Sequence, residues 1–177
     1  MSIIHSLLMV TFPALVLYGA VSDARELRIP NWLSLAILAG FMPVAVLAGI
    51  GLEAIAWHFV AALVTLVVGF VLFAFGLFGG GDAKMMAASA LWVGWPELWV
   101  FALLVVLIGG VLSLMVIVLR KGIGMWPDWL VRQAEGLFTP NKAVPYGIAI
   151  AAGALMMMSR MDVLPQSWRT IFALIIG

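Results

Sequence analysis

Long apolar segments separated by short polar ones run along almost the whole chain. A transmembrane helix needs about 20 predominantly apolar residues. No segment shows the alternation of apolar and polar residues that a membrane β-barrel requires. The pattern therefore predicts an all-α, polytopic bundle of about six transmembrane helices, in one membrane domain over residues 1–177 with no soluble region. The expected segments are Ile3–Ala20, Trp32–Ile50, Ala54–Phe78, Ala83–Gly94, Leu98–Leu119 and Val144–Met158.

Two segments do not fit a simple span. At 1.5 Å per residue, Ala83–Gly94 covers less than ~20 Å, whereas the hydrocarbon core is ~30 Å thick. We expect its neighbours to shelter it, or its helix to continue past Pro96. The tail Gln166–Ile176 is apolar but brief, which indicates an interfacial or partial segment.

Composition excludes most other classes of protein. The chain is 66% hydrophobic and 10% charged, whereas a soluble domain is about 25% charged. Its net charge of +1 and the lack of a basic run give no reason to expect a nucleic-acid partner, and the lipid bilayer is the expected surroundings. The absence of cysteine excludes disulfides, thiolate zinc sites and cysteine nucleophiles. His5 and His58 lie far apart, which favours polar groups inside a bundle over a metal site, so we expect no metal and no cofactor.

Basic residues predict the orientation, because Lys and Arg mark cytoplasmic loops. Loops two and four carry Glu53 and Glu97 and no Lys or Arg, so loops one, three and five should face the cytoplasm and the N-terminus the outside. Arg160 and Arg169 in the tail argue against this orientation. The basic residues of the odd loops are Arg25, Arg28, Lys84, Arg120, Lys121, Arg132 and Lys142. An aromatic belt of membrane anchors is expected at Trp32, Trp92, Trp95, Trp99 and Trp126.

Two of the eight acids fall at the same predicted depth. Asp23 follows the first segment and Asp82 precedes the fourth, both on the cytoplasmic face. Two carboxyl groups in a partly dry site share a proton near neutrality, because both cannot ionise comfortably. The ionised acid can then take a proton from water while the protonated one polarises a scissile carbonyl.

A purely structural interpretation stands beside this one. Asp82 suits the N-cap of the fourth helix, and Asp23 can be an ordinary loop acid beside Arg25. The simplest interpretation of Lys84 is an interfacial lysine whose ammonium group reaches the water boundary. If its side chain instead folded back onto Asp82, it would lower the pKa of that carboxyl group. We expect Glu26 to form an ion pair with a nearby arginine rather than to attract a basic substrate.

Three blocks resemble the signatures of type IV prepilin peptidases, which are GxGD-type membrane aspartic peptidases. They are "SDARELRIPN" (Ser22–Asn31), "GGGDAK" (Gly79–Lys84) and "KAVPYG" (Lys142–Gly147), in the family's order. The resemblance implies Asp23 and Asp82 as the catalytic pair. Its supporting motif residues are Ile29, Pro30, Asn31, Gly79, Gly80, Gly81, Lys84, Pro145, Tyr146 and Gly147.

Each block also has a physical interpretation. Pro30 directly before a helix is tolerated and should hold Asp23 close to the second segment. The three glycines permit positive φ and leave room for a peptide backbone beside Asp82. Pro145, Tyr146 and Gly147 are expected to serve packing rather than catalysis.

The resemblance implies a multi-pass protein of the bacterial cytoplasmic (inner) membrane with its active site on the cytoplasmic side. Its substrates would be prepilins or pseudopilins, cleaved where a basic leader meets an apolar helix, and pilus assembly machinery is a possible partner. Larger relatives carry a four-cysteine zinc region associated with N-methylation. This cysteine-free chain looks like the short, peptidase-only form, similar to that of Flp pili in tight-adherence systems.

Two other functions use the same features. A proton-coupled transporter or ion-binding bundle also combines broken spans with membrane acids, but it would place polar residues at the midplane rather than at segment ends. A non-catalytic assembly or scaffold subunit is the third alternative, and no feature speaks for it specifically.

Overall fold

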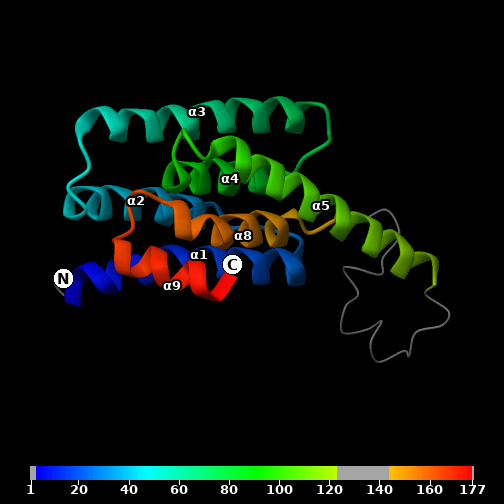
Figure 1. Ribbon diagram of the computed structural model, residues 1–177. Coiled ribbons are helices and arrows are strands. Elements are labelled where there is room, and N and C mark those ends of the chain that lie inside the picture. Colours follow the sequence, from blue (N-terminus) through cyan, green and yellow to red (C-terminus); the bar gives the residue numbers. More distant parts are fainter. Residues whose placement is uncertain (1–2, 123–143, 177) are drawn as a thin grey trace.

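The computed structural model describes residues 3–122 and 144–176, with side chains for residues 10–122 and 144–175. All regular elements in these ranges are helices, as predicted (Figure 1). The acids Asp128 and Glu135 and the orientation residues Trp126, Arg132 and Lys142 lie outside the described residues. The helices are α1 (Ile3–Glu26), α2 (Asn31–Leu47), α3 (Leu52–Ala74), α4 (Gly80–Val93), α5 (Leu98–Lys121), α8 (Tyr146–Met157), the 3₁₀ turn η2 (Met158–Arg160) and α9 (Gln166–Ile176).

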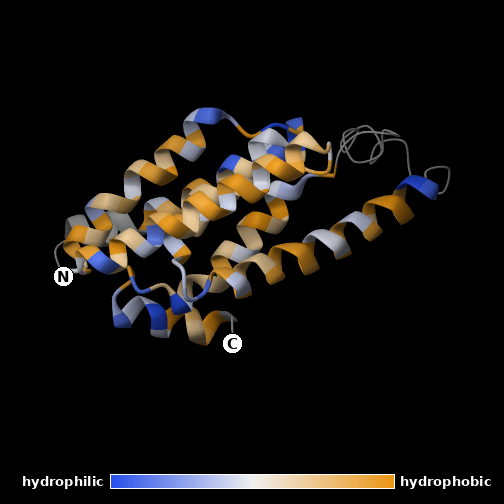
Figure 2. Ribbon diagram, turned by 90° about the horizontal axis from the view of Figure 1, so that it is seen from above, coloured by the Kyte–Doolittle hydropathy of each residue, from blue (hydrophilic) through white to orange (hydrophobic). Residues whose placement is uncertain are grey.

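Two helices, α3 and α5, are long and apolar enough to cross a membrane. Helix α2 and the segment Tyr146–Arg160 are apolar but shorter. Large apolar side chains on the outer faces of α3 and α5 are widely exposed, and Figure 2 shows apolar residues along most of both helices. Such a surface suits lipid and not water. The number of six spans and their orientation stay predictions.

The short helix α4 is enclosed by its neighbours, as its length requires. It packs against α3, α2 and α8, and every residue from Ala87 to Val93 is buried. A Cβ atom added to Gly69 of α3 would lie 3.0 Å from the Cβ of Ala83, so a glycine lets these two helices approach closely. The alternative of a helix continuing past Pro96 is wrong, since α4 ends at Val93.

His58 fixes the end of α4 from inside the bundle. Its Nδ1 lies 2.6 Å from the carbonyl oxygen of Leu91, and its ring packs on Gly94, which follows α4 with φ +82°. The interpretation of His58 as a polar group satisfied in a bundle is confirmed. The side chain of His5 is not among those described.

Trp92 is a core residue, so its assignment to an interfacial belt is wrong. It is 0% exposed, its ring stacks on Phe12 at 4.6 Å between centroids, and its Nε1 donates to the carbonyl of Ile37 at 2.9 Å. The enclosure of residues 87–93 of α4 explains the error, because a position near the end of a short central helix does not reach the surface. Trp32 and Trp99 are exposed, as belt residues would be.

The tail forms α9, whose residues Trp168 and Phe172 pack on the core while Leu174 and Ile175 are exposed. At 1.5 Å per residue this helix is too short to cross a bilayer. A short helix with one face on the core and another face exposed agrees with the interfacial or partial segment expected from the sequence.

Replacing Gly94 should test how α4 is terminated. Gly94→Ala places a Cβ 2.7 Å from the His58 ring in addition to the cost of positive φ. The matched control is Gly49→Ala, which has φ +71° and nothing within 4 Å of the added atom. We expect Gly94→Ala to lose about 1–3 kcal/mol more unfolding free energy than the control, the usual cost of overpacking a core. Thermal unfolding in detergent measures it, and equal losses would contradict the packing role of His58.

Candidate active site

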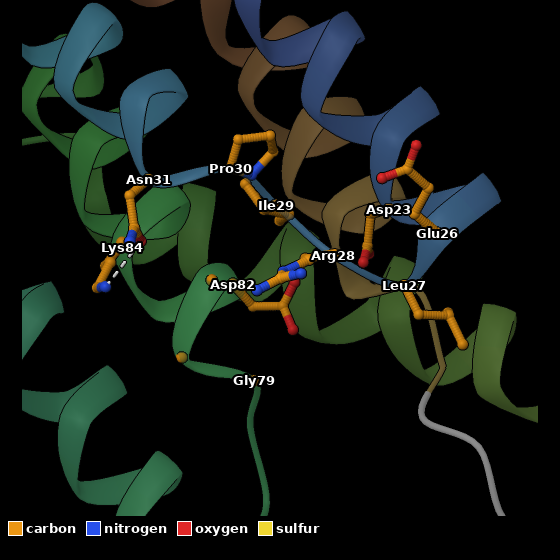
Figure 3. Close-up of a pocket in the computed structure, with 12 residues that line it drawn as sticks. Asp23, Glu26, Leu27, Arg28, Ile29, Pro30, Asn31, Gly79, Asp82 and Lys84 are labelled. Atoms are coloured by element: carbon orange, nitrogen blue, oxygen red, sulfur yellow. Dashed lines mark hydrogen bonds between the residues drawn. The ribbon is translucent and has the colours of Figure 1, made fainter.

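A pocket of about 630 Å³ lies where the end of α1, the segment leading to α2 and the start of α4 meet. Asp23 and Asp82 both line it, although 59 positions separate them in the chain. Figure 3 shows the two carboxyl groups reaching this pocket from different helices. Of the other motif residues, the pocket wall contains Ile29, Pro30, Asn31, Gly79, Gly80, Gly81 and Lys84, but not Pro145, Tyr146 or Gly147.

Asp23 belongs to a helix and not to a loop. Helix α1 continues to Glu26, past the expected end at Ala20, and this brings Asp23 to the bundle interior, where it is 5% exposed. The backbone N–H of Gly147 in α8 donates to Asp23 Oδ2 at 2.7 Å. The interpretation of Asp23 as an ordinary loop acid is therefore wrong.

Gly147 is a glycine because Asp23 occupies the space of its side chain. An added Cβ would lie 2.8 Å from Asp23 Cβ and 2.9 Å from Oδ2. Tyr146 anchors the same helix end, since its ring packs on Gly109 of α5 and meets Phe78 edge to face at 5.5 Å. The third sequence block thus does pack, as expected, but its backbone also donates a hydrogen bond to Asp23, which no sequence pattern predicts.

The segment between α1 and α2 is tied down at both ends. Leu27 adopts φ 52° and its N–H bonds to the carbonyl of Asp23 at 2.9 Å, which ends α1. The left-handed conformation costs a residue with a side chain roughly 1–2 kcal/mol. The Ser22 hydroxyl donates to the carbonyl of Arg28 at 2.8 Å, and Pro30 directly precedes α2, as predicted. These contacts hold the chain that carries Ile29 against the start of α4.

The three glycines accommodate parts of the protein itself. A side chain on Gly81 would meet Ile29 at 3.1 Å, one on Gly80 would meet the ring of Phe73 at 3.3 Å, and one on Gly79 would collide with the Asp82 carboxyl group. None of the three has positive φ, and Gly80 and Gly81 lie inside α4. The positive φ that these glycines permit is therefore not adopted here; the positive φ in this region belongs to Gly76, at +70°.

Asp82 is the third residue of α4, so it is not the N-cap, a place taken by Gly79. An acid in the first turn is still favoured by the helix dipole. Its Oδ1 is buried and has no hydrogen-bond partner among the described residues. An unpaired buried carboxyl oxygen is costly when ionised, which favours the protonated form.

The environments of the two acids differ. Both carboxyl groups lie outside the apolar segments predicted to span the membrane. Burial and, to a smaller extent, the negative charge of Asp23 raise the pKa of Asp82 to about 7, and the hydrogen bond from the Gly79 backbone partly opposes them. Burial also raises the pKa of Asp23, but the hydrogen bond from Gly147 opposes it by stabilising the carboxylate. Near neutrality the pair is thus suited to hold one proton, with Asp82 as its natural carrier.

Other charged groups surround the pocket without pairing to these acids. The Lys84 ammonium donates to Asn31 Oδ1 at 2.9 Å and does not fold back onto Asp82 (Figure 3). Glu26 and Arg28 line the pocket, and Glu26 makes no ion pair with a described residue, so the expected pair with arginine is not found in the described part of the chain. Within that part, no three His, Cys, Asp or Glu side chains gather closely enough to hold a metal ion.

The raised pKa of Asp82 predicts a pH-dependent effect on stability. A group whose pKa rises on folding stabilises the fold below its ordinary pKa of 3.8 and loses that contribution as the pH passes about 7. Asp82→Asn removes the ionisation. The melting temperature of this variant minus that of the unmodified protein should therefore increase from about pH 5 to about pH 8, on either side of the transition. Glu53→Gln, an exposed acid at the start of α3, should show no such trend. A pH-independent difference for Asp82→Asn would contradict the assignment.

Comparison with known proteins adds the family. Residues 10–114 match the model of the type IV leader peptidase family, which covers more than half of the chain and includes both Asp23 and Asp82. No curated protein and no solved structure matches the chain. The family implies a peptidase that acts on prepilins, and the apolar helices agree with a membrane protein. On the strength of this match, the chain belongs to the type IV leader peptidase family.

Proposed function

We propose that this protein is a membrane aspartic endopeptidase that removes the basic leader from type IV prepilins or pseudopilins, with Asp23 and Asp82 as its catalytic pair. The observation that carries the proposal is the convergence of two carboxyl groups, one on α1 and one on α4, on a single pocket. Membership of a leader peptidase family supplies the reaction class and the substrate class. No other group in the pocket combines burial with a raised pKa.

The two acids take different roles in this mechanism. Ionised Asp23 accepts a proton from a water molecule, whose oxygen attacks the scissile carbonyl carbon. Protonated Asp82 donates to the carbonyl oxygen, giving a neutral tetrahedral diol. Asp23, now protonated, gives its proton to the leaving nitrogen, and ionised Asp82 takes a proton from one hydroxyl of the diol. The C–N bond breaks, the leader carboxylic acid and the mature amine are released, and both aspartates return to their starting states.

Gly147 is a positioning residue in this scheme. Its N–H holds Oδ2 of Asp23, so the carboxylate keeps one oxygen fixed and presents the other to water. The same bond favours ionisation of Asp23 over Asp82. Asp82 also has a backbone hydrogen bond, from Gly79, but burial and the charge of Asp23 outweigh it, so the surroundings and not the type of side chain distinguish the base from the acid.

The cellular setting follows from the orientation predicted from Lys and Arg. The pocket would face the cytoplasm from a multi-pass protein of the bacterial inner membrane, where the basic leader of a prepilin also lies. Resemblance to the short, cysteine-free form supports a substrate of the Flp type. Pilus assembly machinery would receive the mature product.

Leader cleavage tests the catalytic pair. In membranes containing a co-expressed Flp-type prepilin, Asp23→Asn and Asp82→Asn should each reduce cleavage by roughly 10²-fold or more, the usual contribution of a general acid or base. Glu53→Gln is the matched control, because it neutralises an exposed acid outside the pocket and should cleave normally. Full cleavage by either Asp variant would overturn the pair. Proton-coupled uptake lost in Asp82→Asn, without proteolysis in any variant, would favour the transporter.

Gly147→Ala tests the positioning role. The added methyl group should push Asp23 away from the Gly147 N–H, lowering kcat and raising the pKa seen on the acidic limb of the pH–rate profile. Gly110→Ala in α5 meets nothing within 4 Å and should change neither. A lower rate with an unshifted acidic limb would indicate a packing role alone.

A further inference from the structure

A second hollow, an apolar groove of about 430 Å³, lies between α2 and α3 with α4 as its floor. The residues of each wall follow the spacing of one helix face, i, i+3, i+4 and i+7. On α2 they are Asn31, Ser34, Leu35 and Leu38; on α3 they are Phe59, Ala62, Leu63 and Leu66. The floor is made of Lys84, Ala87 and Ala88. Two helical ridges above a floor of small side chains form the kind of surface that accepts a third helix.

The groove is continuous with the pocket that contains the two aspartates. Asn31 and Lys84 line both hollows, and the hydrogen bond between them marks the boundary. Helices α2 and α3 are joined at Ala48–Gly51, so Leu38 and Phe59 lie toward that turn and Asn31 and Leu66 toward the pocket. The polar hollow and the apolar groove therefore follow one another along a single direction.

The groove is open to the surroundings of the bundle. Leu35 and Leu63, one on each wall, are 64% and 61% exposed. Ser34, one turn beyond Asn31, has a buried hydroxyl with no hydrogen-bond partner among the described residues. An apolar surface that is open to lipid and leads into a polar pocket suits a peptide that changes from an apolar helix to an extended strand.

We propose that this groove binds the apolar helix of the prepilin, the segment that directly follows the scissile bond. This inference rests on the proposed function. The order of the two hollows, polar and then apolar, matches the order of leader junction and apolar helix in that substrate. From its first to its last lining residue each wall covers eight residues, a rise of ~10 Å or about two helical turns, which gives the groove enough length to fix the substrate in depth and rotation. The substrate helix enters sideways from the bilayer and need not leave the lipid.

Disulfide cross-linking tests the groove directly, because the chain contains no cysteine of its own. Leu35→Cys and Leu63→Cys are placed singly in an Asp82→Asn background, which keeps the substrate uncut. Leu103→Cys and Val106→Cys are matched controls, apolar and equally exposed on α5. Each is oxidised in membranes with an Flp-type prepilin carrying one cysteine at successive positions of its apolar helix. We expect cross-links from the groove positions that recur every three or four substrate residues, and none from α5.

A kinetic readout in the unmodified background supplements the cross-links. Leu63→Trp should narrow the groove and raise KM for prepilin cleavage about tenfold with kcat little changed. Leu103→Trp should change neither value.

The outcomes separate the groove from the catalytic proposal. Normal cleavage with cross-links only from α5, or from all four positions alike, overturns the groove and leaves the aspartic pair intact. Disulfides between two copies of the enzyme at Leu63→Cys would assign the groove to self-association, and an unchanged KM without cross-links would assign it to lipid; both overturn it. An unmodified protein that cleaves no prepilin overturns the proposed function, and the groove proposal with it.

Discussion

The hydrogen bond from the Gly147 N–H to Asp23 Oδ2 is the constraint on which the site depends. It joins the first helix to α8 across 124 positions of sequence, with both groups buried. A buried carboxylate needs such a donor, because an unpaired one costs several kcal/mol. The bond requires α1 to continue past its apolar stretch and α8 to have a residue without a side chain at its second position. Tyr146, packed on Gly109, keeps that helix end in place. The third sequence block is therefore part of the site through its backbone, even though it does not line the pocket.

The second acid, Asp82, lies in surroundings that favour its protonated form. Asp82 has one oxygen near the Gly79 backbone and the other buried without a partner among the described residues. The same side chain in two surroundings thus gives two different proton affinities, which a reaction with one base and one acid requires. The glycines around Asp82 are best understood in this light. They let Ile29 and Phe73 approach the first turn of α4 closely, the same turn that carries Asp82.

The sequence predicted the helices well and their surroundings less well. Apolar runs located every segment to within a few residues except at Asp23, where the polar residues after Ala20 hid the continuation of α1. Trp92 was misplaced because a window of sequence does not reveal that a short helix is enclosed on all sides. The pairing of Asp23 with Asp82 was predictable from charge counting and from the motifs. The Gly147 hydrogen bond was not predictable, because a backbone donor has no sequence signal. The glycine run Gly79–Gly81 has a similar limit, because its sequence does not show whether the space beside it is empty or filled by other residues.

Helix α4 links the candidate active-site pocket to the groove, and this connection bears on the specificity of the proposed reaction. Asp82 lies in its first turn, and the groove floor at Ala87 and Ala88 lies five and six residues further on, a rise of about 8 Å. Because one rigid, buried helix carries both, the distance from the acid to the floor is fixed. A substrate whose apolar helix sits on Ala87 and Ala88 must unwind within that distance to present its backbone to Asp82. Cleavage would then occur at the junction between leader and helix because the fixed distance along α4, from Ala87 and Ala88 to Asp82, sets the position of the scissile bond relative to the bound substrate helix. Recognition of the leader sequence by the pocket would not be needed.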